Sequence, residues 1–134
     1  MGYMKLWDKK TGENRGYIAA DAVQNVMVVP DKSLPNDNLC PVSWYQDSDG
    51  QLWLDSKNAA FQRRQLGLGS ANVADWGIPS PGGWRNPLIY HADKTIELKD
   101  YPNRFLSLPN GIGGSVYWSG DANDPTILCG QIED

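Results

Sequence analysis

A short polar segment beside an aromatic residue is the part of this sequence best suited to hold a ligand. Asp121 and Asn123 follow closely after Trp118. An aromatic ring can stack on the apolar face of a pyranose, while a carboxylate and an amide hydrogen-bond to its hydroxyl groups. These three residues predict a shallow sugar-binding site. The alternative is an Asx-type turn next to a core tryptophan, and the sequence leaves both interpretations open.

A second candidate site lies in the segment from Ala74 to Pro87, which is rich in proline and glycine. This segment contains Trp76, Trp84 and Asn86. Because proline partly orders the unbound chain, such a loop loses less entropy when it binds. We include these three residues in the predicted sugar site, with a platform for a protein partner as a further use of the loop. The other interpretation is that the indoles fill one end of the core.

Residues for catalysis, metals or cofactors are scarce. The single histidine, His91, has a sequence context that indicates a hairpin tip with a hydrogen bond to Asp93. Residues 111–115 are rich in glycine but lack the lysine of a phosphate-binding loop. Cys40 and Cys129 together with one histidine are too few ligands for a zinc cage. We interpret the cysteines as small buried residues, with a disulfide as the alternative. We predict no catalytic residue, metal site or cofactor, and therefore no enzyme.

The charge balance excludes several partners. Twelve Lys and Arg against sixteen Asp and Glu give a net charge of −4, so no basic surplus is present to neutralise nucleic-acid phosphates. No apolar stretch approaches the roughly 18 residues of a membrane helix. The first residues contain no apolar run typical of a signal peptide. We therefore expect a cytoplasmic location, with release by a non-classical route left open. The expected partners are glycans, small sugars or a protein.

Short apolar segments separated by turn residues predict the elements that position these groups. The 14 Gly and 9 Pro among 134 residues interrupt the chain too often for long helices. Apolar bursts at roughly ten-residue spacing are typical of an all-β barrel or sandwich. The bursts are 4–7, 17–20, 26–29, 42–45, 51–54, 65–68, 88–90, 95–98, 105–108, 115–118 and 126–129. Residues 55–66 contain good helix formers, and we expect a single turn there within a loop.

Similar patterns recur at about one third of the chain length. An apolar-x-apolar pattern begins at Leu52 and again at Ile96, 44 residues later. A Leu-x-Leu pattern followed by a glycine-containing loop and a tryptophan begins at Leu66 and again at Leu106, 40 residues later. These offsets predict a single domain, 1–134, made of three four-stranded pseudo-repeats at about 1–48, 49–92 and 93–134.

The last predicted repeat resembles the ricin-B-like β-trefoil lectins. The resemblance rests on segments 95–98, 101–108 and 113–118, which match a strand, a hairpin that ends in Leu-x-Leu and a strand that ends in an aromatic residue. It implies a β-trefoil fold and carbohydrate binding without catalysis. The chain departs from the family's Gln-x-Trp motif, because 42–44 and 130–132 have other residues where the first and last copies would fall.

A narrower resemblance concerns segments 66–70, 82–86 and 98–102. These look similar to the single-domain mushroom trefoils, a fungal group that includes an Agaricus mannose-binding protein and the lectin-like light subunit of mushroom tyrosinase. This resemblance implies a mannose-type sugar as the preferred ligand. The alternative function is a protein-binding trefoil, either an accessory subunit of a larger enzyme or a protease inhibitor, that docks through the Ala74–Pro87 loop.

Overall fold

Short β-strands make up most of the regular structure in the described part of this protein. The computed structural model describes residues 3–20, 25–30, 40–41, 43–44, 52–54, 64–77 and 87–133. Within these ranges there is no α-helix, and one 3-10 turn spans Ser70–Asn72. The predicted all-β class is therefore confirmed. None of the helical structure in these ranges is long and apolar enough to cross a membrane.

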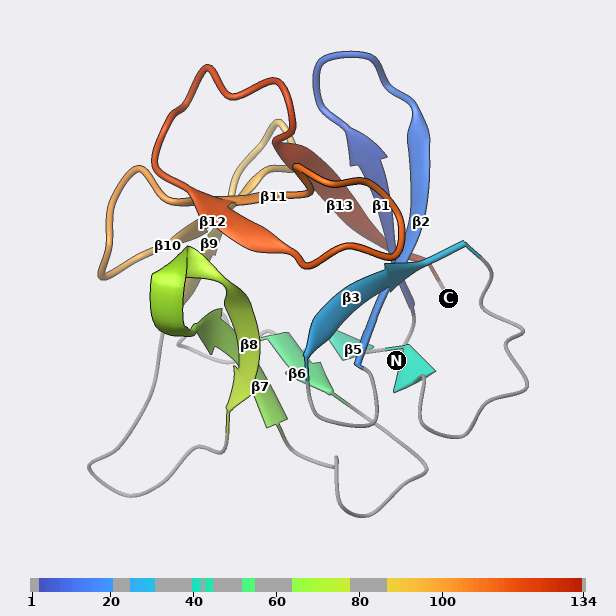
Figure 1. Cartoon of the computed structure of the whole chain (residues 1–134), viewed down its shortest axis with the longest axis horizontal. Helices are drawn as coiled ribbons and strands as arrows, with labels where there is room; N and C mark the ends of the chain where they lie inside the picture. Colours follow the sequence, from blue (N-terminus) through green and yellow to red (C-terminus); the bar gives the residue numbers. More distant parts are fainter. Residues whose placement is uncertain are drawn as a thin grey trace.

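The strands form three antiparallel sheets (Figure 1). The first sheet has the order β13 (Leu128–Glu133), β1 (Tyr3–Asp8), β2 (Asn14–Ala20) and β3 (Val26–Val29), and β4 (Cys40–Pro41) also pairs with β2. The second sheet contains β5 (Ser43–Trp44), β6 (Leu52–Leu54), β7 (Arg64–Leu68) and β8 (Ala74–Gly77) in chain order. The third contains β9 (Leu88–Tyr90), β10 (Ile96–Leu98), β11 (Phe105–Ser107) and β12 (Tyr117–Ser119), also in chain order.

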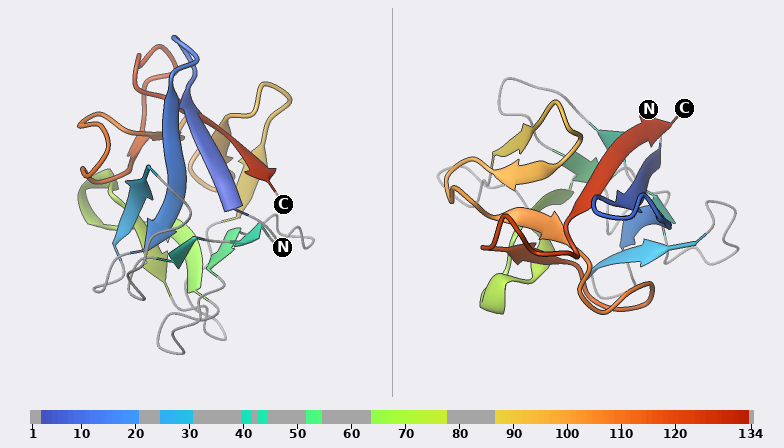
Figure 2. Two further views of the ribbon diagram at one scale, coloured as in Figure 1. Left: turned by 90° about the vertical axis from the view of Figure 1, so that its right-hand side faces the viewer. Right: turned by 90° about the horizontal axis from the view of Figure 1, so that it is seen from above.

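The first and last strands lie side by side and bring the two ends of the chain together (Figure 2). β1 pairs with β13 from Tyr3 opposite Glu133 to Asp8 opposite Leu128. In the first sheet the C-terminal strand therefore takes the place that β5 and β9 take in the other two. Each sheet thus contains one run of four neighbouring strands.

Successive side chains of β1 alternate between the core and the surface. Met4 and Leu6 are buried, whereas Lys5 and Trp7 are partly exposed. Because successive side chains of a strand point to opposite faces, one face of β1 joins the core and the other faces outward. The outward face leaves an ammonium group and an indole ring near the surface.

Among the described residues, an apolar cluster packs between the three sheets. Its fully buried members include Leu6 and Ile18 from the first sheet, Leu66 from the second, and Leu98 and Leu106 from the third. Burying one side chain of this size contributes roughly 1.5–3 kcal/mol. Because this core is shared, each sheet depends on the other two for its burial.

Two tryptophans connect neighbouring sheets through hydrogen bonds. The indole N–H of Trp76 in β8 donates to the backbone carbonyl of Ala19 in the first sheet at 3.3 Å. The indole N–H of Trp118 in β12 donates to the backbone carbonyl of Gly67 in the second sheet at 2.9 Å. Each tryptophan therefore ties its own sheet to the preceding one.

Candidate functional site

The structure corrects the predicted sugar-stacking role of Trp118 and Trp76. Each is only 1% exposed and donates its indole N–H within the core, so neither ring face is open to a sugar. Trp76 lies in strand β8 rather than in a loop. It shares the buried face of that strand with Ala74. Both placements agree with the core alternative considered from the sequence. The other two predicted residues of this segment, Trp84 and Asn86, lie outside the described residues.

Asp121 and Asn123 are exposed and lie in the turn that follows β12. The Oδ1 atom of Asp121 accepts a hydrogen bond from the backbone N–H of Asn123 at 2.9 Å. This is the Asx-type turn that the sequence left as one alternative. Because both side chains are exposed, the turn still presents two polar groups that a ligand can reach.

Asp124 anchors this turn. Its Oδ2 atom accepts a hydrogen bond from the hydroxyl of Ser119 at 2.7 Å. Its Oδ1 atom accepts two from Thr126, from the hydroxyl at 2.7 Å and from the N–H at 2.8 Å. Burial alone would raise the pKa of the Asp124 carboxyl, but these hydrogen bonds outweigh it and hold the pKa below its ordinary value of 3.8. The turn is therefore built around an ionised carboxylate at neutral pH.

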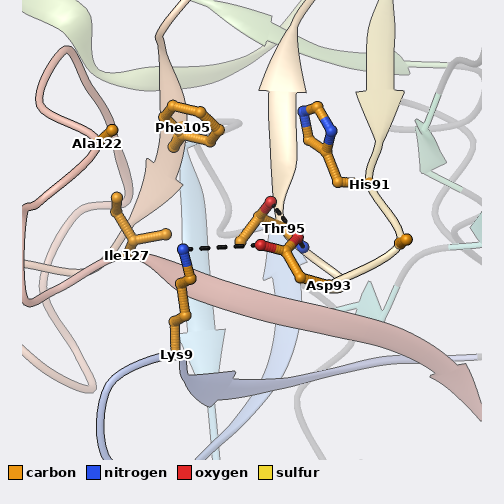
Figure 3. A pocket seen from close by; sticks show the side chains of 8 residues that line it. Lys9, His91, Asp93, Thr95, Phe105, Ala122 and Ile127 are labelled. Atoms are coloured by element: carbon orange, nitrogen blue, oxygen red, sulfur yellow. Dashed lines mark hydrogen bonds and ion pairs between the residues drawn. The ribbon is translucent and has the colours of Figure 1, made fainter.

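The turn borders a pocket of about 430 Å³ where four segments of the chain meet (Figure 3). The segments are the hairpin between β1 and β2, the hairpin between β9 and β10, strand β11 and residues 120–127. The pocket is lined by Lys9, His91, Ala92, Asp93, Thr95, Phe105, Ala122 and Ile127. Asp121 and Asn123 are the sequence neighbours of the lining residue Ala122. The predicted polar residues therefore belong to the segment that forms one side of this pocket.

Backbone hydrogen bonds connect the two hairpins to the last part of the chain. The N–H of Lys9 donates to the carbonyl of Ile127 at 3.0 Å, and the N–H of Gly130 donates to the carbonyl of Lys94 at 2.9 Å. Asp8 closes the first hairpin, because its Oδ1 atom accepts hydrogen bonds from the backbone N–H groups of Lys10 and Thr11, at 2.9 and 3.1 Å. Binding to a pocket that is already ordered costs less conformational entropy.

Asp93 both shapes its hairpin and supplies a charge to the pocket. Its Oδ1 atom accepts hydrogen bonds from the N–H and the hydroxyl of Thr95 at 3.1 and 2.6 Å. These two hydrogen bonds hold the pKa of the Asp93 carboxyl below its ordinary value of 3.8, and the bond from the hydroxyl has the larger effect. Its Oδ2 atom lies 3.6 Å from Nζ of Lys9 (Figure 3). The Lys9 and Asp93 side chains are 45% and 52% exposed, so solvent screens this ion pair and both groups can be reached by a ligand.

His91 pairs with Glu97, so the predicted hydrogen bond to Asp93 is wrong. The His91 Nε2 atom lies 2.7 Å from Oε1 of Glu97. Glu97 Oε2 accepts a further hydrogen bond from the N–H of Asn103 at 2.6 Å. The physical reason is the two-residue period of a strand. Thr95 lies beside His91, whose N–H donates to the Thr95 carbonyl, and Glu97 lies two residues further along on the same face as Thr95. The nearer carboxylate, Asp93, is already engaged by Thr95.

Phe105 supplies an aromatic wall to the pocket. It lies in β11 opposite Glu97, and its ring centroid is 6.1 Å from that of His91, with the planes tilted by 38°. The apolar pattern predicts a strand at Phe105 but no role in binding, and Lys9 is not among the predicted site residues. Nothing in the local pattern indicates that these two residues meet in one pocket, because each lies on a different sheet.

The described residues contain no group of three or more His, Cys, Asp or Glu side chains arranged to hold a metal. Cys129 is buried and free, and its Sγ atom donates to the carbonyl of Asp93 at 3.3 Å. Burial raises the pKa of the Cys129 thiol. For Cys129 the prediction of a small buried residue is confirmed. The Cys40 side chain lies outside the described part of the chain.

Comparisons with known proteins assign no family to the chain. No family model matches it, and no curated protein matches it. The lectin resemblance therefore remains an expectation from the sequence.

Proposed function

We propose that this protein is a non-catalytic, lectin-like carbohydrate-binding protein and that it binds a sugar in the pocket lined by Lys9, Asp93 and Phe105. The observation that carries the proposal is an aromatic ring in the same pocket as an exposed ammonium and an exposed carboxylate. A pyranose has an apolar C–H face and hydroxyl groups that both donate and accept hydrogen bonds. The pocket offers a partner for each of these features.

The polar groups have complementary roles in this proposal. The Lys9 ammonium donates to sugar oxygens, and the Asp93 carboxylate accepts from sugar hydroxyls. Glu97 holds the His91 ring beside Phe105, and this arrangement limits the orientation of the bound sugar ring. Asp121 and Asn123 contact the outer part of the same sugar or the next residue of a glycan. A mannose-type sugar is the first ligand to test, on the basis of the sequence resemblance alone.

We also propose that the three sheets correspond to the pseudo-repeats of a β-trefoil. Their boundaries differ from the predicted 1–48, 49–92 and 93–134, because β5 belongs to the second sheet, β9 to the third and β13 to the first. The support is that matching strands have matching cross-strand pairs in each sheet. These pairs are Ile18 with Val28, Leu66 with Trp76, and Leu106 with Trp118. The acceptors of the two indole hydrogen bonds, Ala19 and Gly67, directly follow the first member of the pair in their own sheets. The same connection is thus made twice around the shared core.

Calorimetric titration with the methyl glycosides of mannose, galactose and N-acetylglucosamine tests the function. We expect weak binding, with dissociation constants in roughly the millimolar range, because a shallow pocket buries little of a single sugar. Asp93→Asn keeps an acceptor for Thr95 but removes the charge, and Lys9→Ala removes the donor. Each change should weaken binding by about tenfold. Lys10→Ala, an exposed lysine of the same hairpin, is the matched control and should bind like the wild type.

A glycan array extends the test to larger ligands. The absence of detectable binding both in the titrations and across the array would refute carbohydrate recognition. A protein partner captured by a chain that ignores every sugar would instead favour the protein-binding alternative. Binding that persists unchanged in both pocket variants would show that the sugar occupies another site.

A further inference from the structure

A second hollow, of about 480 Å³, lies against the first sheet. It is lined by Lys5, Trp7, Gly12, Asn14, Gln131 and Glu133. None of these residues lines the first pocket. Met4 and Leu6, which alternate with Lys5 and Trp7 along β1, are buried in the core. The hollow therefore lies on the outward face of the sheet, away from the core.

The strand register gathers its lining residues. Lys5 lies opposite Gln131 of β13, and Trp7 lies opposite Asn14 of β2. The register between β1 and β2 shifts between Leu6 and Trp7. Such irregularities bend a strand locally and change the direction of the side chains beside them. Residues from both ends of the chain thus form one surface around the Trp7 ring.

Trp7 differs from the two core tryptophans in its surroundings. Trp76 and Trp118 are 1% exposed and donate their indole N–H groups to backbone carbonyls. Trp7 is partly exposed and lines an open hollow. No hydrogen bond of its indole N–H is found to any residue in the described part of the chain. Its ring and its donor are therefore both positioned to meet a ligand.

The neighbouring groups are held in place by contacts of their own. The hydroxyl of Tyr17 donates to Oε2 of Glu133 at 3.2 Å, and the Tyr17 ring packs edge-on against Tyr3 with centroids 6.5 Å apart. The Oδ1 atom of Asn14 accepts the N–H of Gly16 at 3.0 Å. This bond fixes the Asn14 side chain and leaves its NH₂ group as the part that can donate to a ligand.

The remaining wall is bare backbone. Gly12 has φ +75°, and a Cβ built on it would meet no heavy atom within 4 Å. The space in front of Gly12 is therefore empty, and a ligand can approach its peptide groups closely. A side chain added at this position would project into open space beside the hollow.

We propose that this hollow is a second carbohydrate site, which takes one neutral hexopyranose unit stacked on Trp7. The lining carries one positive group, Lys5, and one negative group, Glu133, so it has no net charge that would select an anion or a cation. The two carboxamides, Asn14 and Gln131, supply donors and acceptors that match sugar hydroxyls. This inference rests on carbohydrate recognition as the proposed function, but it assigns a site separate from the Phe105 pocket. Two such sites on one chain let the protein bridge two sugar units.

Fluorine NMR of protein labelled with 5-fluorotryptophan tests the second site directly. The chain has six tryptophans, and Trp7→Phe identifies the Trp7 resonance. On titration with the three methyl glycosides used above, at least one should shift the Trp7 resonance. The resonances of buried Trp76 and Trp118, identified in the same way, should stay in place. The Trp7 shift should persist in Lys9→Ala, because that variant affects only the first pocket.

Variants in the second hollow complete the test. Gln131→Ala, at an exposed position, should raise the sugar concentration needed for half of the Trp7 shift by about tenfold, while Lys10→Ala leaves it unchanged. A Trp7 resonance that stays in place while calorimetry detects sugar binding overturns the second site and leaves the proposed function intact. A Trp7 shift that disappears in Lys9→Ala also overturns it, because the shift then originates in the first pocket. Silence in calorimetry, the array and NMR together refutes the proposed function itself.

Discussion

The indole N–H of Trp118 in β12 donates a hydrogen bond of 2.9 Å to the backbone carbonyl of Gly67 in β7, across 51 positions of the sequence. Both groups are buried, so the bond is made where water cannot replace it. A buried carbonyl that loses its donor bears the full cost of desolvation. This one contact therefore fixes the orientation of a large core ring and the relative position of two sheets.

Trp118→Phe should lower the free energy of unfolding by about 2–4 kcal/mol. The variant loses ring volume in the core and leaves the Gly67 carbonyl without its donor. Urea denaturation followed by circular dichroism measures the effect. Trp7→Phe makes the same chemical change on the outward face of β1, and it should cost less than about 0.5 kcal/mol. Equal losses in the two variants would contradict the placement of Trp118 in the core.

Two glycines near the first hairpin should respond very differently to a methyl group. Gly16 has φ +99°, and a Cβ there would lie 2.1 Å from the carbonyl oxygen of Val29. Gly16→Ala should therefore cost more than about 3 kcal/mol or prevent folding. Gly12 has φ +75° but open space around it, so Gly12→Ala should cost only about 1 kcal/mol. Thermal unfolding compares them, and a Gly16→Ala protein as stable as Gly12→Ala would show that β2 and β3 do not approach this closely.

Gln65 is a buried polar residue whose side chain makes no hydrogen bond within the described residues. Its side chain is 1% exposed, and neither Oε1 nor Nε2 has a hydrogen-bond partner in the part of the chain that the structure describes. Gln65→Met keeps a similar length and removes both polar atoms, so it should raise the free energy of unfolding by about 1–2 kcal/mol. Gln131→Met, at an exposed position, should change it by less than about 0.5 kcal/mol. A loss of stability in Gln65→Met would mean that the amide is hydrogen-bonded in solution.

Acid should destabilise the fold through Asp93 and Asp124. Hydrogen bonds hold the pKa of each carboxyl below 3.8 in the folded protein, whereas both return to about 3.9 on unfolding. A lowered folded pKa contributes stability that is complete above the unfolded value and is lost as pH falls through the folded value. Urea titrations should therefore show the free energy of unfolding decreasing below about pH 4.

Substitutions separate the contribution of one turn from the general effect of acid. Asp124→Asn should be less stable than the wild type at neutral pH, and its stability should fall less steeply below about pH 4. Asp100→Asn, at an exposed position, should follow the wild-type slope. If Asp124→Asn also kept the wild-type slope, the turn after β12 would not depend on the ionised carboxylate.

Much of the strand pattern is predictable because it depends on neighbours along the chain. The bursts 26–29 and 88–90 coincide with β3 and β9, and the burst 65–68 lies within β7. The Asx turn at Asp121 is also a local feature, since the side chain bonds to the backbone two residues later. Strand β8 was missed, because its glycine and the prolines that follow it indicate a loop while its pairing with β7 makes it a strand.

The binding residues were harder to predict than the strands. Tryptophan is equally suited to a core and to a sugar platform, so its presence at 76 and 118 does not distinguish the two. Only the packing of three sheets shows that these rings are enclosed and that Trp7 is not. In the same way, the Phe105 pocket depends on two hairpins, a strand and a turn that meet only in the folded chain.

The all-β class, most of the described strands and the Asx turn at Asp121 follow from the sequence alone, because the two-residue period of a strand and the hydrogen bonds of a turn involve residues close together in the chain. Residues 55–63 of the segment 55–66, in which a turn is expected, lie outside the described residues. The tertiary structure decided which aromatic rings are buried, that His91 pairs with Glu97, and that Lys9 reaches Asp93 across two hairpins. These outcomes depend on which sheet packs against which, and burial and long-range contacts are properties of the whole core rather than of any local pattern.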